Sequence, residues 1–145
     1  MNMKILSGDC HCRNITFQIE LTNDSSTYIP RACDCDFCKK HGASYISDKA
    51  GQLTIKVEND SNLSRYRQGS GMAEFLLCKA CGVLIGAVYR EAGQMYGAIN
   101  SKSIDNGADF GKESVTSPKL LADSEKIERW RDLWFSKVEI KFVGE

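Results

Sequence analysis

Long apolar segments are missing from this chain of 145 residues. The longest apolar run, residues 83–89, is interrupted by Gly86 and is far shorter than the roughly 20 residues that a helix needs to cross a bilayer. The N-terminal residues reach a polar segment at Ser7, before any apolar stretch of signal-peptide length. We therefore expect a soluble cytoplasmic protein with no membrane partner.

A predominant sign of charge is also missing, because 19 basic and 19 acidic side chains cancel. Such a balance creates no overall field that attracts nucleic acid. The sequence also lacks an aromatic-basic motif, an internal repeat and a low-complexity linker. With 42% apolar residues, we expect one domain spanning residues 1–145 and no nucleic-acid partner.

Proline is scarce, with two residues against twelve glycines, and glycine supplies the turns and bulges that bent sheets require. Residues 15–21 alternate between apolar and polar side chains, which predicts a strand with one buried and one solvent-exposed face. The chain is predicted to be mainly β. Further strands are expected at residues 43–46, 53–57, 64–67, 73–77, 83–89 and 94–99, with a last one within 136–143.

A helix is expected near the C-terminus. Residues 117–118 (Ser-Pro) fit a cap and a first helical residue, and the segment 123–125 (Asp-Ser-Glu) offers a second start. Ile127, Trp130 and Trp134 then recur at helical spacing. We expect this stripe to pack on the sheet as core; a substrate-stacking surface is the alternative.

Cysteine, by contrast, is abundant. Structural disulfides are not expected, because the cytosol keeps thiols reduced, so metal binding or redox chemistry is the leading explanation. The seven cysteines form three clusters: Cys10 and Cys12; Cys33, Cys35 and Cys38; Cys78 and Cys81.

The last cluster, Cys78-Lys79-Ala80-Cys81-Gly82, has the pattern of a zinc knuckle. A two-residue spacer lets both thiolates reach one tetrahedral ion, and the glycine that follows turns the backbone. The expected partner is the pair Cys10 and Cys12. Four thiolates leave no vacancy on zinc, so this site is predicted to be structural, with a folding contribution on the order of 10 kcal/mol.

The middle cluster supplies three thiolates within six residues, Cys33, Cys35 and Cys38. Three ligands occupy three corners of a tetrahedron, and an open fourth position is typical of catalytic zinc. We predict a second, open zinc site here. A rival hypothesis makes Cys35 and Cys38 a redox pair, but that motif belongs at a strand-to-helix turn in a βαβ unit, and strand-like sequence is expected to follow.

Histidines and acids also lie near the cysteines in the sequence. His11 lies between two expected ligands, and we expect it to point away from the ion. The alternative to an open second site is that a protein side chain fills the fourth corner. The local candidates for that ligand are His41, Asp34 and Asp36.

The three clusters and their neighbours resemble the glutathione-dependent formaldehyde-activating and centromere protein V family. The likeness rests on residues 8–12 (GDCHC), 33–43 (CDCDFCKKHGA) and 78–83 (CKACGV). It continues in residues 66–71 and 97–105 and spans about residues 4–105. Residues 112–145 form a C-terminal extension that the resemblance does not cover.

The resemblance implies bent antiparallel sheets of the β-tent type, pinned by two zinc ions. It implies the same division of the cysteines, with the open zinc held by Cys33, Cys35 and Cys38. Family enzymes are carbon-sulfur lyases that join glutathione and formaldehyde to S-(hydroxymethyl)glutathione, or reverse that step. We therefore expect a small thiol and a small aldehyde as substrates; a non-catalytic zinc scaffold is the alternative, and the oligomeric state is open.

Adduct formation also needs a proton donor near the developing alkoxide. Tyr45, Tyr66 and His41 are the candidates. Nearby basic side chains fit the carboxylates of a glutathione-like ligand, although solvated surface charge is the commoner role of such residues. The basic candidates are Arg31, Lys39, Lys40, Arg65 and Arg67.

Overall fold

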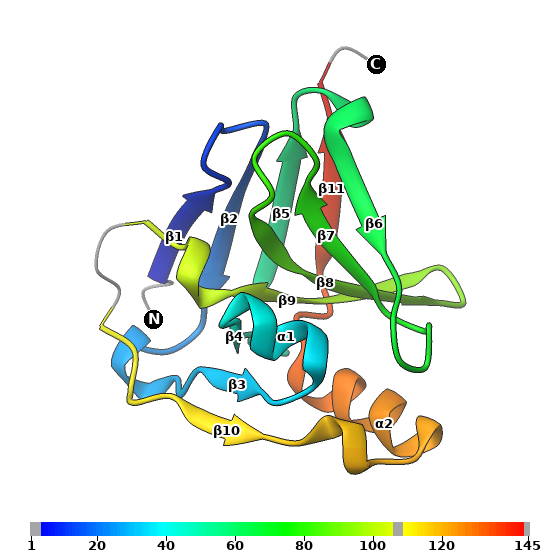
Figure 1. Ribbon diagram of the computed structural model, residues 1–145. Coiled ribbons are helices and arrows are strands. Elements are labelled where there is room, and N and C mark those ends of the chain that lie inside the picture. Colours follow the sequence, from blue (N-terminus) through cyan, green and yellow to red (C-terminus); the bar gives the residue numbers. More distant parts are fainter. Residues whose placement is uncertain (1–3, 106–108, 144–145) are drawn as a thin grey trace.

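The computed structural model describes residues 4–105 and 109–143 (Figure 1). Several of its strands alternate between buried and exposed side chains. In β2 (Ile15–Leu21) the four apolar residues are all buried, as the alternation predicts. It belongs to a four-stranded sheet of order β1-β2-β5-β11. The other members are β1 (Lys4–Asp9), β5 (Gln52–Val57) and β11 (Val138–Phe142).

The second sheet has seven strands in the order β10-β3-β4-β9-β8-β7-β6. Its members are β10 (Ser114–Thr116), β3 (Arg31–Cys33), β4 (Ser44–Ile46), β9 (Gln94–Asn100), β8 (Leu84–Glu91), β7 (Glu74–Cys78) and β6 (Leu63–Tyr66). The chain is thus mainly β, as expected. Each expected strand is confirmed to within about two residues, whereas β1, β3 and β10 were not anticipated.

Most strand pairs are antiparallel, but the two C-terminal strands pair in parallel. β10 lies parallel to β3, and β11 lies parallel to β5. Between these strands the chain forms α2 (Asp123–Leu133), so this helix is attached at one end to each sheet (Figure 1).

Two apolar clusters lie on opposite faces of the seven-stranded sheet. One fills the space toward the four-stranded sheet and includes Ile85 and Val88. The other lies toward α2 and includes Ala87 and Tyr89. β8 contributes to both clusters, which explains why residues 83–89 read as a continuous apolar run rather than an alternating one.

The C-terminal helix starts at the second of its two expected sites. Residues 118–120 form a short 3-10 turn (Pro118–Leu120) in which Ser117 makes no side-chain cap. In α2, Glu125 accepts a hydrogen bond from the Ala122 amide at 2.8 Å. Trp130 and Trp134 are each 7% exposed, so their predicted role as core is confirmed.

Three further 3-10 turns and one short helix complete the part of the chain that the structure describes. The helix, α1 (Asp36–His41), was not anticipated. The turns are η1 (Ser25–Thr27), η2 (Asp60–Asn62) and η3 (Ser101–Ser103). Among the described residues, none of the helices has the length and apolar character needed to span a membrane.

Candidate functional site

Four of the cysteines meet where two strand connections from different sheets approach each other. Cys10 and Cys12 follow β1, whereas Cys78 ends β7 and Cys81 follows it. The Sγ atoms of Cys10 and Cys12 are 3.8 Å apart, and those of Cys12 and Cys78 are 3.5 Å apart. Sulfurs bound to one zinc at about 2.3 Å lie about 3.8 Å from each other in a tetrahedron. This group therefore has the spacing of a metal site that joins the sheets.

The knuckle adopts the backbone expected of it. Gly82 has φ 83°, a conformation that L-residues with a side chain rarely adopt. The Cys81 amide donates a hydrogen bond to Cys78 Sγ at 3.4 Å. His11 is exposed and does not belong to the sulfur group, in agreement with its predicted place away from the ion.

The other three cysteines form a second group at the start of α1. Cys33 ends β3, Cys35 caps α1, and Cys38 lies within that helix. The Sγ atoms lie within 4.8 Å of one another. The Cys38 amide donates to Cys35 Sγ at 3.4 Å, which repeats the geometry of the knuckle. The group has the spacing to hold a metal ion through three thiolates.

None of the three candidates for a fourth ligand joins this group among the described residues. His41 is exposed and packs against the Phe37 ring at 4.7 Å between centroids. Asp36 is also exposed, and Asp34 accepts a hydrogen bond from the Ser117 hydroxyl at 2.7 Å. In this arrangement the three thiols have no imidazole or carboxylate partner within the part of the chain that the structure describes.

The structure both supports and weakens the hypothesis that Cys35 and Cys38 form a redox pair. The expectation that strand-like sequence follows Cys38 was wrong, because Cys35 and Cys38 lie at a strand-to-helix turn formed by β3 and α1. However, β3 and β4 on either side of α1 are antiparallel, so the segment is not a βαβ unit. The structure also brings a third thiol, Cys33, to the same point.

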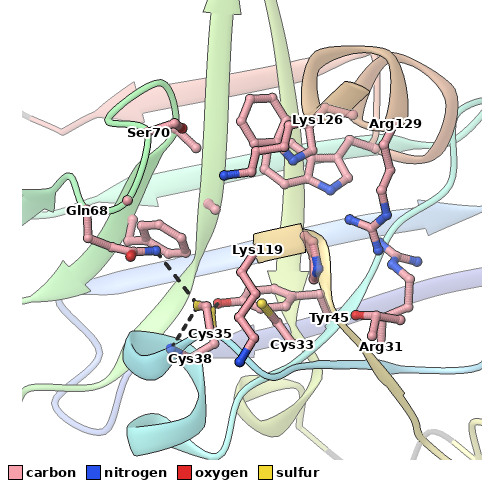
Figure 2. Close-up of a pocket in the computed structure, with 18 residues that line it drawn as sticks. Arg31, Cys33, Cys35, Cys38, Tyr45, Gln68, Ser70, Lys119, Lys126 and Arg129 are labelled. Carbon is pink, nitrogen blue, oxygen red and sulfur yellow. Dashed lines mark hydrogen bonds between the residues drawn. The ribbon is translucent and has the colours of Figure 1, made fainter. Parts of the chain in front are cut away.

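A cavity of about 130 Å³ opens beside the three thiols (Figure 2). The three cysteines form part of its wall together with Tyr45, whose Oη is 3.1 Å from Cys38 Sγ. Burial raises the pKa of Tyr45, so its hydroxyl keeps its proton at neutral pH. Tyr66 and His41 do not line this cavity, which leaves Tyr45 as the best situated of the three proton-donor candidates.

The thiols beside the cavity differ in acidity. A hydrogen bond from Cys38 lowers the pKa of Cys33 to about 6. The same contact, together with burial, raises the pKa of Cys38. Gln68 reaches the group from the β6–β7 loop, with its Nε2 3.8 Å from Cys35 Sγ (Figure 2).

One of the five basic residues singled out from the sequence lies at the cavity. Arg31 lines it, whereas Lys39, Lys40, Arg65 and Arg67 do not. Arg65 and Arg67 instead lie 4.0 and 3.7 Å from the carboxylate of the buried Glu74.

The sequence interpretation missed several residues of the cavity wall. Three are basic and come from residues 118–133, a segment in which the sequence indicated an aromatic stripe facing the sheet but no basic residue of the site. Trp130 and Trp134 line the cavity as well as the core, so the alternative of a substrate-facing surface applies to part of each ring. The missed polar residues are Gln68, Ser70, Thr116, Lys119, Lys126 and Arg129.

Comparison with known proteins agrees with this geometry. The sequence model of a family described as "Glutathione-dependent formaldehyde-activating enzyme" matches residues 5–117. The chain belongs to this family. The matched region contains all seven cysteines, so both sulfur groups are part of the family domain, whereas α2 and β11 lie beyond it.

The chain is also similar to a solved structure. A crystal structure of a Rhodobacter sphaeroides protein is 26% identical, with a TM-score of 0.56. The match covers 99% of that chain and 76% of this one, so about a quarter of this chain has no counterpart there. No curated protein matches the chain.

Proposed function

We propose that this protein is a zinc-dependent carbon-sulfur lyase that forms or cleaves the adduct of a small thiol with a small aldehyde. The observation that carries this proposal is the group of three thiols in the wall of a cavity, with no imidazole or carboxylate partner among the described residues. The family description supports glutathione as the thiol and formaldehyde as the aldehyde.

The donor sets favour zinc at both sulfur groups, because thiolates bind zinc in preference to harder divalent ions. The group of Cys10, Cys12, Cys78 and Cys81 would hold a structural ion. Cys33, Cys35 and Cys38 would hold a second ion, which supplies an open position where a substrate thiol ionises at neutral pH. Two ions per chain follow from this division.

The reaction itself forms one carbon-sulfur bond and moves one proton from the thiol to the carbonyl oxygen. In the synthetic direction the substrate sulfur bonds to the carbonyl carbon, the π electron pair of the carbonyl moves to oxygen, and the proton lost by the thiol ends on that oxygen. In the reverse direction the hydroxyl gives up its proton, the carbon-sulfur bond breaks, and its electron pair stays on sulfur. No oxidant or reductant is required.

Tyr45 is the protein group best situated for the proton step. Its hydroxyl lines the cavity and lies 3.1 Å from Cys38 Sγ, so a carbonyl bound beside the sulfurs would be within reach of its hydrogen bond. The cavity wall also contains Phe75, Trp130 and Trp134. These apolar rings exclude water, which strengthens a hydrogen bond to the developing alkoxide.

The test is an exchange experiment with glutathione and ¹³C-labelled formaldehyde. Magnetisation-exchange NMR measures how fast the adduct and the free aldehyde interconvert. The zinc-loaded protein should raise this rate, Cys35→Ser should abolish the increase, and His41→Ala, a change next to the thiols but outside the cavity, should preserve it. If the protein with two bound ions leaves the rate at the uncatalysed value, the non-catalytic zinc scaffold becomes the better description.

A further inference from the structure

The cavity wall carries an excess of positive charge. Four cationic side chains line it, Arg31, Lys119, Lys126 and Arg129, and none of the described lining residues is acidic. Lys119 lies 4.0 Å from the Asp34 carboxylate. The other three cations make no salt bridge with any described residue, although the chain as a whole has equal numbers of acids and bases.

The sulfur group does not account for these charges. Three thiolates and one dication together carry a single negative charge, −3 + 2 = −1. Arg31, Lys126 and Arg129 carry three positive charges, which leaves +2 in the cavity. Unbalanced charge in a partly buried site is costly, so the arrangement calls for an anionic ligand.

Two of the cations, Arg31 and Arg129, approach each other from different elements. Arg31 extends from β3 and Arg129 from α2, and Figure 2 shows their guanidinium groups converging on one side of the cavity. Both arginines are half-buried. Two half-buried guanidinium groups that converge repel each other, and a bound anion would offset this unfavourable charge.

Arg31 is held in position by the end of α2. Its Nη2 donates a hydrogen bond to Ser47 Oγ at 2.7 Å, and Ser47 Oγ donates to the Leu133 carbonyl at 2.6 Å. The remaining N–H groups of Arg31 are free of described partners. A guanidinium fixed in this way presents a planar set of donors that matches a carboxylate.

We propose that Arg31 and Arg129 form an anion subsite that binds a carboxylate of the substrate, while the sulfur of the same molecule faces Cys33, Cys35 and Cys38. The substrate class is thus a thiol that carries a carboxylate. The assignment of the sulfur end rests on the proposed function. The anion subsite rests on the two arginines, and Arg129 lies beyond residues 5–117, so this part of the selectivity belongs to the C-terminal segment of this chain.

The size of the cavity is consistent with a ligand that enters by one end. Pockets that enclose a drug-sized molecule measure about 300–1,000 Å³, and this cavity measures about 130 Å³. It would enclose a short thiol acid completely. Of a tripeptide thiol it would enclose the thiol and one carboxylate arm.

The test compares two thiols that differ only at the anionic end, 3-mercaptopropionate and 3-mercaptopropionamide. Each is titrated into the zinc-loaded protein by calorimetry, with tryptophan fluorescence as a second readout. The wild-type protein should bind the acid about tenfold more tightly than the amide, or better, because charge-assisted hydrogen bonds are strong. Arg129→Gln should reduce this ratio to near one, and Arg129→Lys should give an intermediate value.

The matched control is Arg131→Gln, which removes the same charge from the same helix. Arg131 pairs with Glu91 instead of lining the cavity, so this variant should keep the wild-type preference. Equal binding of acid and amide by the wild type would overturn the proposal. An equal loss of preference in the Arg131 variant would also overturn it, because removal of any positive charge from the helix would then explain the effect.

The anion subsite and the lyase activity can fail separately. A wild-type protein that prefers the acid but does not accelerate adduct exchange would retain the subsite and lose the proposed activity. A protein that accelerates exchange equally for the acid and the amide would retain the activity and lose the subsite. The comparison in the wild type holds even if Arg129→Gln does not fold.

Discussion

Tyr45 Oη lies 3.1 Å from Cys38 Sγ, in contact with the sulfur group and in the wall of the cavity. Tyr45 belongs to β4, which pairs on one side with β3 and on the other with β9. A strand held on both sides fixes the phenol in place. The hydroxyl is therefore preorganised beside the thiols without the entropy cost of ordering a mobile side chain.

Tyr45→Phe should lower the rate of adduct exchange by about a hundredfold or more, the range typical of losing a proton donor. Zinc content and the thermal midpoint should stay close to wild type, because the ring still fills its site. NMR exchange measures the rate, metal analysis the zinc content, and thermal denaturation the midpoint. Tyr66→Phe, a change at an exposed residue outside the cavity, is the control, and an unchanged rate in Tyr45→Phe would remove this residue from the mechanism.

The two sulfur groups should differ in their effect on stability. Cys78→Ser should lower the thermal midpoint strongly, since the group containing Cys78 joins the two sheets and structural zinc contributes on the order of 10 kcal/mol. Cys35→Ser should reduce the zinc content from two ions to one with a smaller loss of stability. Elemental analysis and thermal denaturation decide this, and a larger loss in Cys35→Ser would reverse the assignment of structural and open sites.

Gly82→Ala should destabilise the protein by more than backbone strain alone. At φ 83° a side chain costs about 1–2 kcal/mol, and Gly82 also shapes the knuckle. Gly93, with φ 79° in the β8–β9 turn, is a matched control away from the sulfurs. Denaturant titration should show a larger loss for Gly82→Ala than for Gly93→Ala, together with weaker zinc retention; equal losses would mean that the knuckle tolerates the change.

The ion pair between Glu91 and Arg131 predicts a pH dependence of stability. Arg131 donates two hydrogen bonds to this carboxylate, at 2.5 and 2.7 Å, and holds the pKa of Glu91 below 4.5. Because the folded-state pKa is the lower one, the contribution is present above about pH 4.5 and is lost as the pH falls through the folded value.

Glu91→Gln should therefore lower the thermal midpoint at pH 7 but have little effect in strong acid, where Glu91 is already protonated. Thermal denaturation over a pH series measures the difference. Glu128→Gln, at an exposed position on α2, controls for the general effect of removing a negative charge. A deficit of the same size at both ends of the series would contradict the linkage.

The sequence predicted elements that have a strong local pattern. The alternation in β2 and the spacing of the cysteines are both readable within a few residues. The structure confirms the strand and brings the cysteines together in the two expected groups. α1 has only six residues, which is too few for helical periodicity to appear. The three-residue strands β3 and β10 are similarly short, and they depend on pairing partners far along the chain.

The cavity wall was harder to predict because its residues are distant in sequence. Arg31 and Arg129 are 98 positions apart, since 129 − 31 = 98, and no local pattern relates them. Lys39 and Lys40 are closer to the cysteines in sequence, yet they are exposed and lie outside the cavity. The parallel pairing of β10 with β3 and of β11 with β5, together with the packing of Trp130 on the sheet, places α2 beside the cavity.

The attachment of α2 between strands of different sheets limits how a ligand can enter. The pairing of β10 and of β11 restrains outward movement of the helix at both of its ends. The other side of the entrance is the turn between β6 and β7, where Gly69 and Gly71 have positive φ and Gln68 and Ser70 border the cavity. This turn is therefore the part of the entrance best suited to adjust when a bulky molecule is admitted.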